Sequence, residues 1–227
     1  MKLKNSQLII GALGDNMDDA GFIPIIAEES EDDSFQLSDD KLLPILALRN
    51  MVLFPGVMMP VVVGRKKSLR LVREMYKKGR AIGTVAQIDK NTDDPKQADL
   101  FKVGTVAQIV RILEMPDNTT TVILRGRKSF VINEVVSETP YMTASVELRK
   151  EITKVPKSKN FTALVEAIKD LAMRMIRMSS NMPQDLLFAI RNIEKEQFII
   201  NFIAANIGLA LEDRQQLLEI GHIEERA

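Results

Sequence analysis

The amino-acid sequence predicts an α+β fold, in which a small β-barrel with one helix is followed by a small α-helical bundle. Three observations indicate this. Residues 41–150 contain short apolar, β-branched runs bounded by Pro and Gly, a pattern typical of strands joined by tight turns. From residue 161 onward the apolar residues recur at helical spacing. Between the two parts, residues 151–160 form a basic, Pro-containing stretch that we interpret as a linker.

The N-terminal residues 1–40 differ in charge from the rest of the chain. They carry two Lys against ten acidic residues, while the whole chain has 31 basic and 31 acidic residues. Residues 41–227 therefore hold 29 basic and 21 acidic groups. Such a charged stretch buries too little apolar surface to offset the entropy of ordering. We interpret residues 1–40 as a disordered acidic extension with one apolar segment, Phe22–Ile26.

Short strands and one helix are predicted between residues 41 and 150. The strands fall at 46–48, 57–63, 81–88, 103–113, 119–124, 128–136 and 142–148, of which the first two flank a Phe54-Pro55-Gly56 corner. Residues 115–118 between two of the strands predict a hairpin. The spacing of Leu69, Val72 and Met75 predicts a helix over 68–78 that ends at Gly79. Short strands in this number favour a compact, partly closed barrel.

Four short helices are predicted over residues 161–227. The first has one apolar face made of Phe161, Leu164, Val165, Ile168, Leu171, Met175 and Ile176. The chain breaks at 180–183 and continues as a second helix with Leu186, Leu187, Ile190 and Ile193, a third over 198–205 and a fourth over 212–220. The pattern stops without a cap at residue 227, from which we expect a piece of a longer protein.

The amino-acid sequence of two blocks resembles that of the N-terminal, substrate-recognition domain of the Lon family of ATP-dependent serine proteases. The first block supplies Pro44, Leu48-Arg49-Asn50, Phe54-Pro55-Gly56, Pro60 and Gly64-Arg65, and the second supplies Val103–Ile109, Met115–Asn118 and Leu124-Arg125-Gly126. Asn50 and Asn118 depart from the family's usual Asp and Gly, but both are turn formers. The resemblance runs from about residue 41 to the C-terminus.

The resemblance implies a barrel of the pseudouridine-synthase-and-archaeosine-transglycosylase (PUA) type, and a bundle that begins the connection to a missing ATPase domain. It implies a cytoplasmic, homohexameric parent protein that uses ATP and Mg to degrade misfolded, damaged and selected regulatory proteins. Its Ser-Lys dyad would lie outside this chain. This piece would recruit substrates by binding their exposed apolar segments, and we expect no enzyme activity, cofactor or metal in it.

The expected substrate-binding residues surround the Phe54 corner. They are apolar, Met-rich and placed on a loop, where an exposed apolar group usually marks a contact. The predicted set is Met51, Leu53, Phe54, Pro55, Met58 and Met59. On this hypothesis, Phe54→Asp with Met58→Asp weakens capture of an unfolded protein without unfolding the barrel. The competing interpretation is that these residues fill an irregular core. For two methionines of the first predicted helix of the bundle, Met173 and Met175, the core interpretation is the favoured one.

A basic face on the predicted helix offers an alternative function. Lys66, Arg70, Arg73 and Lys77 share one side of residues 65–80, which suits a nucleic-acid-binding PUA-like domain. The absence of Trp and the presence of only two Tyr disfavour base stacking. A solvent-exposed face or a subunit contact is the favoured interpretation. A third hypothesis is that the bundle serves only in assembly.

Sites of several other kinds are excluded by composition. There is no cysteine, which rules out disulfides and thiolate metal sites. No P-loop motif for ATP occurs. The only histidine, His222, is expected at a helix end rather than in a catalytic triad. No run of about 18 apolar residues is present to span a membrane.

Overall fold

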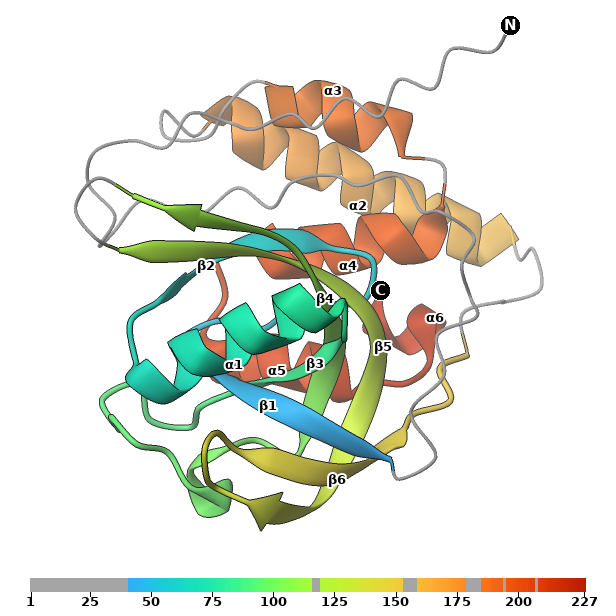
Figure 1. Ribbon diagram of the computed structural model, residues 1–227. Coiled ribbons are helices and arrows are strands. Elements are labelled where there is room, and N and C mark those ends of the chain that lie inside the picture. The colour runs from blue at the N-terminus through green and yellow to red at the C-terminus, as the bar shows by residue number, and fades with distance from the viewer. Residues whose placement is uncertain (1–40, 116–118, 153–158, 179–184, 194, 207) are drawn as a thin grey trace, which may run out of the picture.

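The computed structural model describes residues 41–115, 119–152, 159–178, 185–193, 195–206 and 208–227 (Figure 1). The predicted extension 1–40, the tip of the predicted hairpin and the predicted break at 180–183 lie outside these residues. Six strands form one mixed sheet, and helices cover it: β1 (Leu42–Leu48), β2 (Met58–Val63), β3 (Ile82–Ala86), β4 (Val103–Glu114), β5 (Thr120–Ser137) and β6 (Thr143–Leu148). The predicted α+β class is confirmed.

The sheet closes on itself. Its strand order is β2-β5-β4-β3-β1-β6, and β6 also pairs with β5, so five strands form a ring with β2 added alongside β5. Of the six strands, only β1 and β3 pair in parallel, and β2 and α1 lie between them in the chain. The hairpin expected around 115–118 joins β4 to β5, and the Met115 N–H donates to the Thr119 carbonyl at 2.9 Å.

One long strand replaces two predicted short ones. The segments expected at 119–124 and 128–136 are the single strand β5, which pairs with β2 and β4 along its first part and with β4 and β6 further on. Its pairings include register shifts at Ile132/Glu134 and Val135/Ser137, and bulges of this kind bend a strand. The sequence pattern breaks at Gly126, but the ladder of hydrogen bonds continues through it.

Helix α1 (Lys66–Lys78) forms as predicted and ends at Gly79. Gly79 has φ 63°, a left-handed conformation that glycine adopts without steric cost, and its N–H caps the carbonyls of Met75 and Tyr76. Leu71, Val72 and Met75 face the barrel, where they pack with β1 residues Leu46 and Leu48. The rest of the helix lies on the surface. A short 3-10 turn, η1 (Gln97–Asp99), precedes β4.

The second half of the chain is helical, with α2 (Lys159–Met178), α3 (Asp185–Asn192), α4 (Glu196–Asn206), α5 (Leu211–Glu219) and α6 (Ile223–Arg226). The four predicted helices are present, and α6 is an additional short one. In Figure 1, α2 and α3 lie on the side of α4 away from the barrel. Helix α5 returns to the barrel, where the Gln215 side chain donates to the Val103 carbonyl at 3.0 Å.

The barrel and the helices share a hydrophobic core. One apolar cluster contains Val52, Phe54, Val57, Ala86 and Val103 from the barrel together with residues of α2, α3, α4, α5 and α6. The sequence predicts a barrel domain, 41–150, and a bundle, 161–227, without indicating how they meet. In the structure they pack directly against each other, and the start of the predicted linker takes part. Residues 153–158 of that linker lie outside the described residues.

We expect Gly126→Ala to destabilise the protein by about 1–3 kcal/mol, the usual cost of overpacking. A Cβ atom on Gly126 would lie 2.2 Å from the carbonyl oxygen of Phe54, which is backbone and cannot move aside cheaply. Gly64→Ala is the matched control, because nothing lies within 4 Å of its Cβ position and its φ is not positive. Urea denaturation of both variants tests this. Equal stabilities would show that the Phe54 corner does not contact β5 this closely.

Candidate functional site

The predicted substrate-binding corner is buried. Phe54 and Val57 are 0% exposed, and all of the predicted set except Met51, which is partly exposed, lie in the interior: Leu53, Phe54, Pro55, Met58 and Met59. The expectation that this loop is an exposed contact surface is therefore wrong. A substrate-binding role for these residues stays a prediction, and it would require the surrounding packing to open.

Helix α4 is what covers the corner. The Phe198 ring lies 3.1 Å from the Cβ position of Gly56, and the Asn201 amide donates to the Pro55 carbonyl at 3.0 Å. On the barrel side, the Gly56 N–H donates to the Gly126 carbonyl and the Gly126 N–H donates to the Val57 carbonyl, at 3.0 and 2.9 Å. The apolar character of the loop thus serves the joint between barrel and helices.

A buried polar network strengthens that joint. Arg226 is 5% exposed, and its guanidinium donates to the Asn201 Oδ1 at 2.6 Å and lies 3.8 Å from a Glu151 carboxylate oxygen. The Ser129 hydroxyl donates to the same carboxylate at 2.5 Å. Burial lowers the pKa of Arg226, and the Glu151 charge opposes that shift. These groups connect β5, the segment after β6, α4 and α6.

The C-terminal segment also adds to the barrel by backbone hydrogen bonds. Ile152 forms a parallel bridge with His222, and the Arg149 guanidinium donates to the carbonyls of Leu218 and Glu219 at 3.1 and 2.6 Å. His222 precedes α6, as the sequence predicts for a helix-end histidine, and its Nδ1 is buried without a partner in the described part of the chain. Because Nδ1 has no partner, no acid of the described residues orients the ring as a catalytic triad requires.

An apolar groove lies on the helical part. It has a volume of about 400 Å³, within the range of ligand pockets. Its lining comes from α2, α3, α4, α5 and α6 and from residues next to these helices, and only Asn206 and Arg226 in it are polar. The apolar lining residues are Ile168, Leu171, Ala172, Met175, Ile176, Ile190, Ile200, Phe202, Ile203, Ala204, Leu209, Leu217 and Ala227.

The apolar face predicted for the first helix of the bundle divides in two. Phe161, Val165 and Ile176 are buried in the core shared with the barrel. On the neighbouring side, Leu171 is 58% exposed and Met175 48% exposed, and both line the groove. Leu164 and Met178 are also exposed and continue this stripe at the spacing of one helical face. The core role favoured for Met175 is wrong, while Met173 packs against the shared core.

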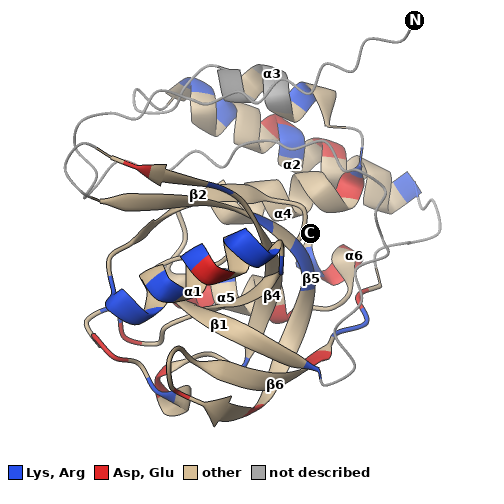
Figure 2. Ribbon diagram, in the orientation of Figure 1, with Lys and Arg blue, Asp and Glu red and all other residues tan. Residues whose placement is uncertain are grey.

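The predicted basic contact face is on the surface. Lys66, Arg70, Arg73 and Lys77 are all exposed, whereas Leu71, Val72 and Met75 of the same helix are buried. Figure 2 shows that most of the coloured turns of α1 are basic. We call these four residues the cationic face. Arg73 forms an ion pair with Glu114 of β4 at 2.9 Å. For the other three residues, the described part of the chain shows no hydrogen bond or ion pair.

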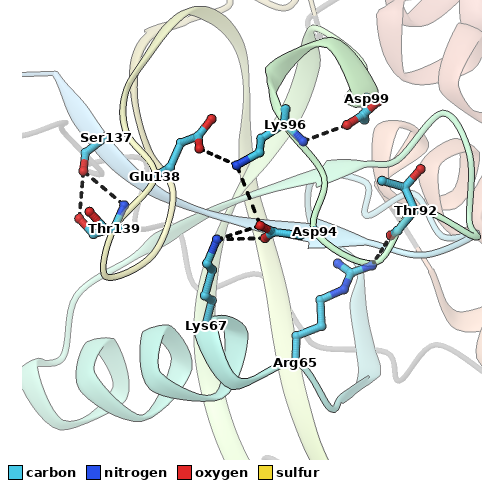
Figure 3. A network of polar contacts seen from close by, with 9 residues as sticks. All are labelled: Arg65, Lys67, Thr92, Asp94, Lys96, Asp99, Ser137, Glu138 and Thr139. Atoms are coloured by element: carbon cyan, nitrogen blue, oxygen red, sulfur yellow. Dashed lines mark hydrogen bonds and ion pairs between the residues drawn. The ribbon is translucent and has the colours of Figure 1, made fainter.

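The opposite edge of α1 holds a network of charges of both signs (Figure 3). Lys67 binds Asp94 at 2.8 Å, Lys96 binds Glu138 at 2.5 Å, and the Arg65 guanidinium donates to the Thr92 carbonyl at 3.1 Å. The hydrogen bond from Lys67 lowers the pKa of Asp94, and the one to Glu138 raises the pKa of Lys96. This network fastens the polar loop 89–99 to α1 and to the turn after β5. Lys67 and Lys96 have acidic partners here, whereas Lys66, Arg70 and Lys77 of the cationic face form no ion pair in the described part of the chain.

Comparisons with known proteins agree with this architecture. The model of the ATP-dependent protease La (Lon) substrate-binding domain matches residues 42–227. This chain belongs to the family of Lon substrate-binding domains. The Lon proteases of Flavobacterium johnsoniae and Porphyromonas gingivalis are 44% and 41% identical to it, over 92% and 94% of this chain but only 26% of each relative. The chain thus spans about a quarter of their length.

Solved structures of the family show the same fold. The Lon N-terminal domain protein of Xanthomonas campestris aligns with a TM-score of 0.59 at 19% identity, over 82% of this chain and 94% of that one. The N-terminal domain of the Mycobacterium avium complex Lon protease gives 0.64 at 16% identity over the same shares. These likenesses confirm the fold, while the family match over residues 42–227 confirms the resemblance inferred from the Phe54 and Leu124 blocks. Among the described residues, none of the helices is long and apolar enough to cross a membrane.

Proposed function

We propose that this domain binds exposed apolar segments of unfolded or damaged proteins in the groove formed by α2, α3 and α4. The observation that carries the proposal is the groove's almost purely apolar lining, with Leu171 and Met175 open to solvent. Polar groups that would fix one ligand are few, so the surface tolerates many apolar shapes. Methionine adds to that tolerance, because its unbranched, polarizable side chain adapts to its partner.

The groove takes the place of the Phe54 corner in the recruitment hypothesis. The family assigns substrate binding to this domain, and a contact surface for unfolded chains must be accessible. Leu171 and Met175 satisfy that condition in the described conformation, whereas Phe54 and Met58 do not. The function inferred from the sequence is thereby kept and its location moved from the barrel to the helices.

Leu171→Gln with Met175→Gln is expected to weaken binding of a permanently unfolded protein about tenfold or more. Removing the burial of one such side chain costs about 1.5–3 kcal/mol, and about 1.4 kcal/mol is a factor of ten in Kd. Glutamine is a good helix former, so we expect the stability of the domain to change by no more than about 0.5 kcal/mol. Fluorescence anisotropy with a labelled, unfolded client measures the affinity.

The matched control is Ile88→Gln with Val136→Gln, which removes two apolar side chains that are 51% and 55% exposed on the barrel side of the molecule. This variant should bind the client like the unaltered domain. Equal affinity in the groove variant and the control would overturn the assignment of the groove.

We further propose that the domain works within a longer, homohexameric, cytoplasmic serine protease that degrades the captured proteins with ATP and Mg. The support is that the Lon proteases that resemble this chain are about four times its length. ATP, Mg and the Ser-Lys dyad would then belong to residues beyond this chain.

Nucleic-acid binding by the cationic face is the second candidate function. It is favoured by the exposure of Lys66, Arg70 and Lys77 and by their lack of ion pairs in the described residues. A single-stranded oligonucleotide that contacts all four cations would give a plot of log affinity against log salt with a slope of about −3, from about −0.7 per neutralised phosphate. A titration at two salt concentrations distinguishes it from the first candidate, since apolar binding of an unfolded protein tolerates salt.

A further inference from the structure

Helix α1 carries more positive charge than its surroundings neutralise. It has six Lys or Arg and one acid, Glu74, and no acid in its first turn. Glu74 is engaged by Lys78 at 2.6 Å, an interaction that lowers its pKa. The pKa of Tyr141, on the same side, is raised mainly by burial and further by the charge of Glu74. Glu114 is taken by Arg73. Lys66, Arg70 and Lys77 form no ion pair in the described part of the chain, although the charge of Arg70 contributes to the lowered pKa of Glu74.

The cations of this face repel one another, and the one acid of α1, Glu74, already forms an ion pair with Lys78. Lys66 and Arg70, and likewise Arg73 and Lys77, are four residues apart, where like charges repel. The helix cannot rotate to bury these cations, because Leu71, Val72 and Met75 hold its other side in the barrel core. The helix N-terminus, with its partial positive charge, adds to the attraction for an anion at Lys66.

The chain itself contains a complementary segment. Residues 28–33, Glu-Glu-Ser-Glu-Asp-Asp, hold five acids in six positions, and α1 presents three cations without an ion pair in the described part of the chain. We propose that this acidic segment docks on the cationic face of α1 in the same molecule. The ligand class that the face takes is thus an acidic peptide, and the extension 1–40 supplies it.

The tether is long enough for this contact. Residue 33 lies eight residues before Lys41, and residue 28 lies thirteen before it, so the two ends of the segment can reach at most about 26–29 Å and about 43–47 Å from Lys41 at 3.3–3.6 Å per residue. Lys41 directly precedes β1, which packs beneath α1 and is about 23 Å long at 3.3 Å per residue. Helix α1, with 13 residues, is about 20 Å long. Tethering also raises the effective concentration of the segment into the millimolar range.

The absence of cysteine makes a direct test possible. Ser30→Cys in the full chain takes a single nitroxide spin label, and the backbone amide signals of the ¹⁵N-labelled protein report which residues the label approaches. We expect a loss of signal intensity on α1 that is restored when the label is reduced. The loss should disappear between about 0.1 and 1 M salt, where the Debye length falls from about 10 to 3 Å.

Neutral variants distinguish the face from charge in general. Lys66→Gln with Arg70→Gln and Lys77→Gln should abolish the signal loss on α1. The control is Arg174→Gln with Arg177→Gln and Arg191→Gln, which removes the same charge from exposed sites on α2 and α3 and should retain it. Signal loss centred on the apolar groove, or loss on α1 that survives the first triple variant, would overturn the proposal.

Two further measurements test the alternatives, which are contact between two copies of the chain and nucleic-acid binding by α1. A mixture of spin-labelled chain without ¹⁵N and ¹⁵N-labelled chain without a spin label detects contacts between copies. Signal loss on α1 in that mixture would overturn docking within one molecule. The proposal also predicts that neutralising residues 28–33 with Gln and Asn increases the affinity of α1 for a single-stranded oligonucleotide several-fold. Equal oligonucleotide affinity with and without the acids, together with no spin-label effect on α1, would assign the face to nucleic acid instead.

Discussion

Phe54→Ala is expected to lower the free energy of unfolding by about 3–5 kcal/mol, the usual cost of truncating a buried aromatic side chain. Phe54 is 0% exposed and belongs to the cluster that joins the barrel to α4 and its neighbours. The loss therefore removes contacts from both halves of the chain at once. Phe54→Asp should be worse, because it places an unpaired carboxylate in the same position. Urea denaturation followed by circular dichroism measures the change.

Tyr76→Ala serves as the aromatic control for this experiment. Tyr76 is 46% exposed on α1, and alanine suits a helix, so we expect a change of about 0.5 kcal/mol or less. If Phe54→Ala were as stable as this control, the corner would be open in solution. That result would support the hypothesis that the loop around Phe54 binds client proteins.

Arg226→Met is expected to cost about 3–5 kcal/mol, the typical effect of removing one partner from a buried ion pair. Methionine retains much of the side-chain volume, so the loss comes mainly from the Glu151 carboxylate and the Asn201 amide oxygen, which are left without the guanidinium. Asn201 also holds the Pro55 carbonyl. The effect should spread to the Phe54 corner, where hydrogen exchange of the Gly56 and Val57 amides would increase.

A second substitution tests the cause. Adding Glu151→Gln to Arg226→Met removes the uncompensated charge while keeping an oxygen that accepts from Ser129, so the double variant should be more stable than the single one. Arg177→Met, at an exposed position of α2, should change stability by about 0.5 kcal/mol or less. A single variant as stable as that control would show that the network does not hold the C-terminal segment on the barrel.

Local patterns in the sequence were sufficient to predict the elements and the family. Helix α1 is determined by the spacing of Leu69, Val72 and Met75 and by Gly79, whose left-handed conformation ends it. The exposure of the cationic face follows from the same period, because residues on the side opposite a buried stripe face solvent. Motifs carried in single blocks, such as Phe54-Pro55-Gly56, were sufficient to recognise a Lon substrate-binding domain.

Which apolar residues are exposed depended on contacts between distant parts of the chain. The Phe54 corner and the stripe of Leu171 and Met175 are equally apolar in the sequence, and a loop is the more common place for an exposed contact. Helix α4, roughly 145 residues after the corner, covers Phe54 through Phe198 and Asn201. Helix α2 has more apolar surface than its partners cover, so the remainder lines the groove.

The sequence by itself thus determined the α+β class, the position of most helices and strands, the family and the charged side of α1, because each depends on neighbours within a few residues. The tertiary structure alone decided the closure of the sheet through β5 and β6, the merging of barrel and helices around one core, and the location of the accessible apolar surface. Burial is a property of the packed molecule: a side chain is covered by residues from anywhere in the chain, and the hydrophobic effect does not specify which ones.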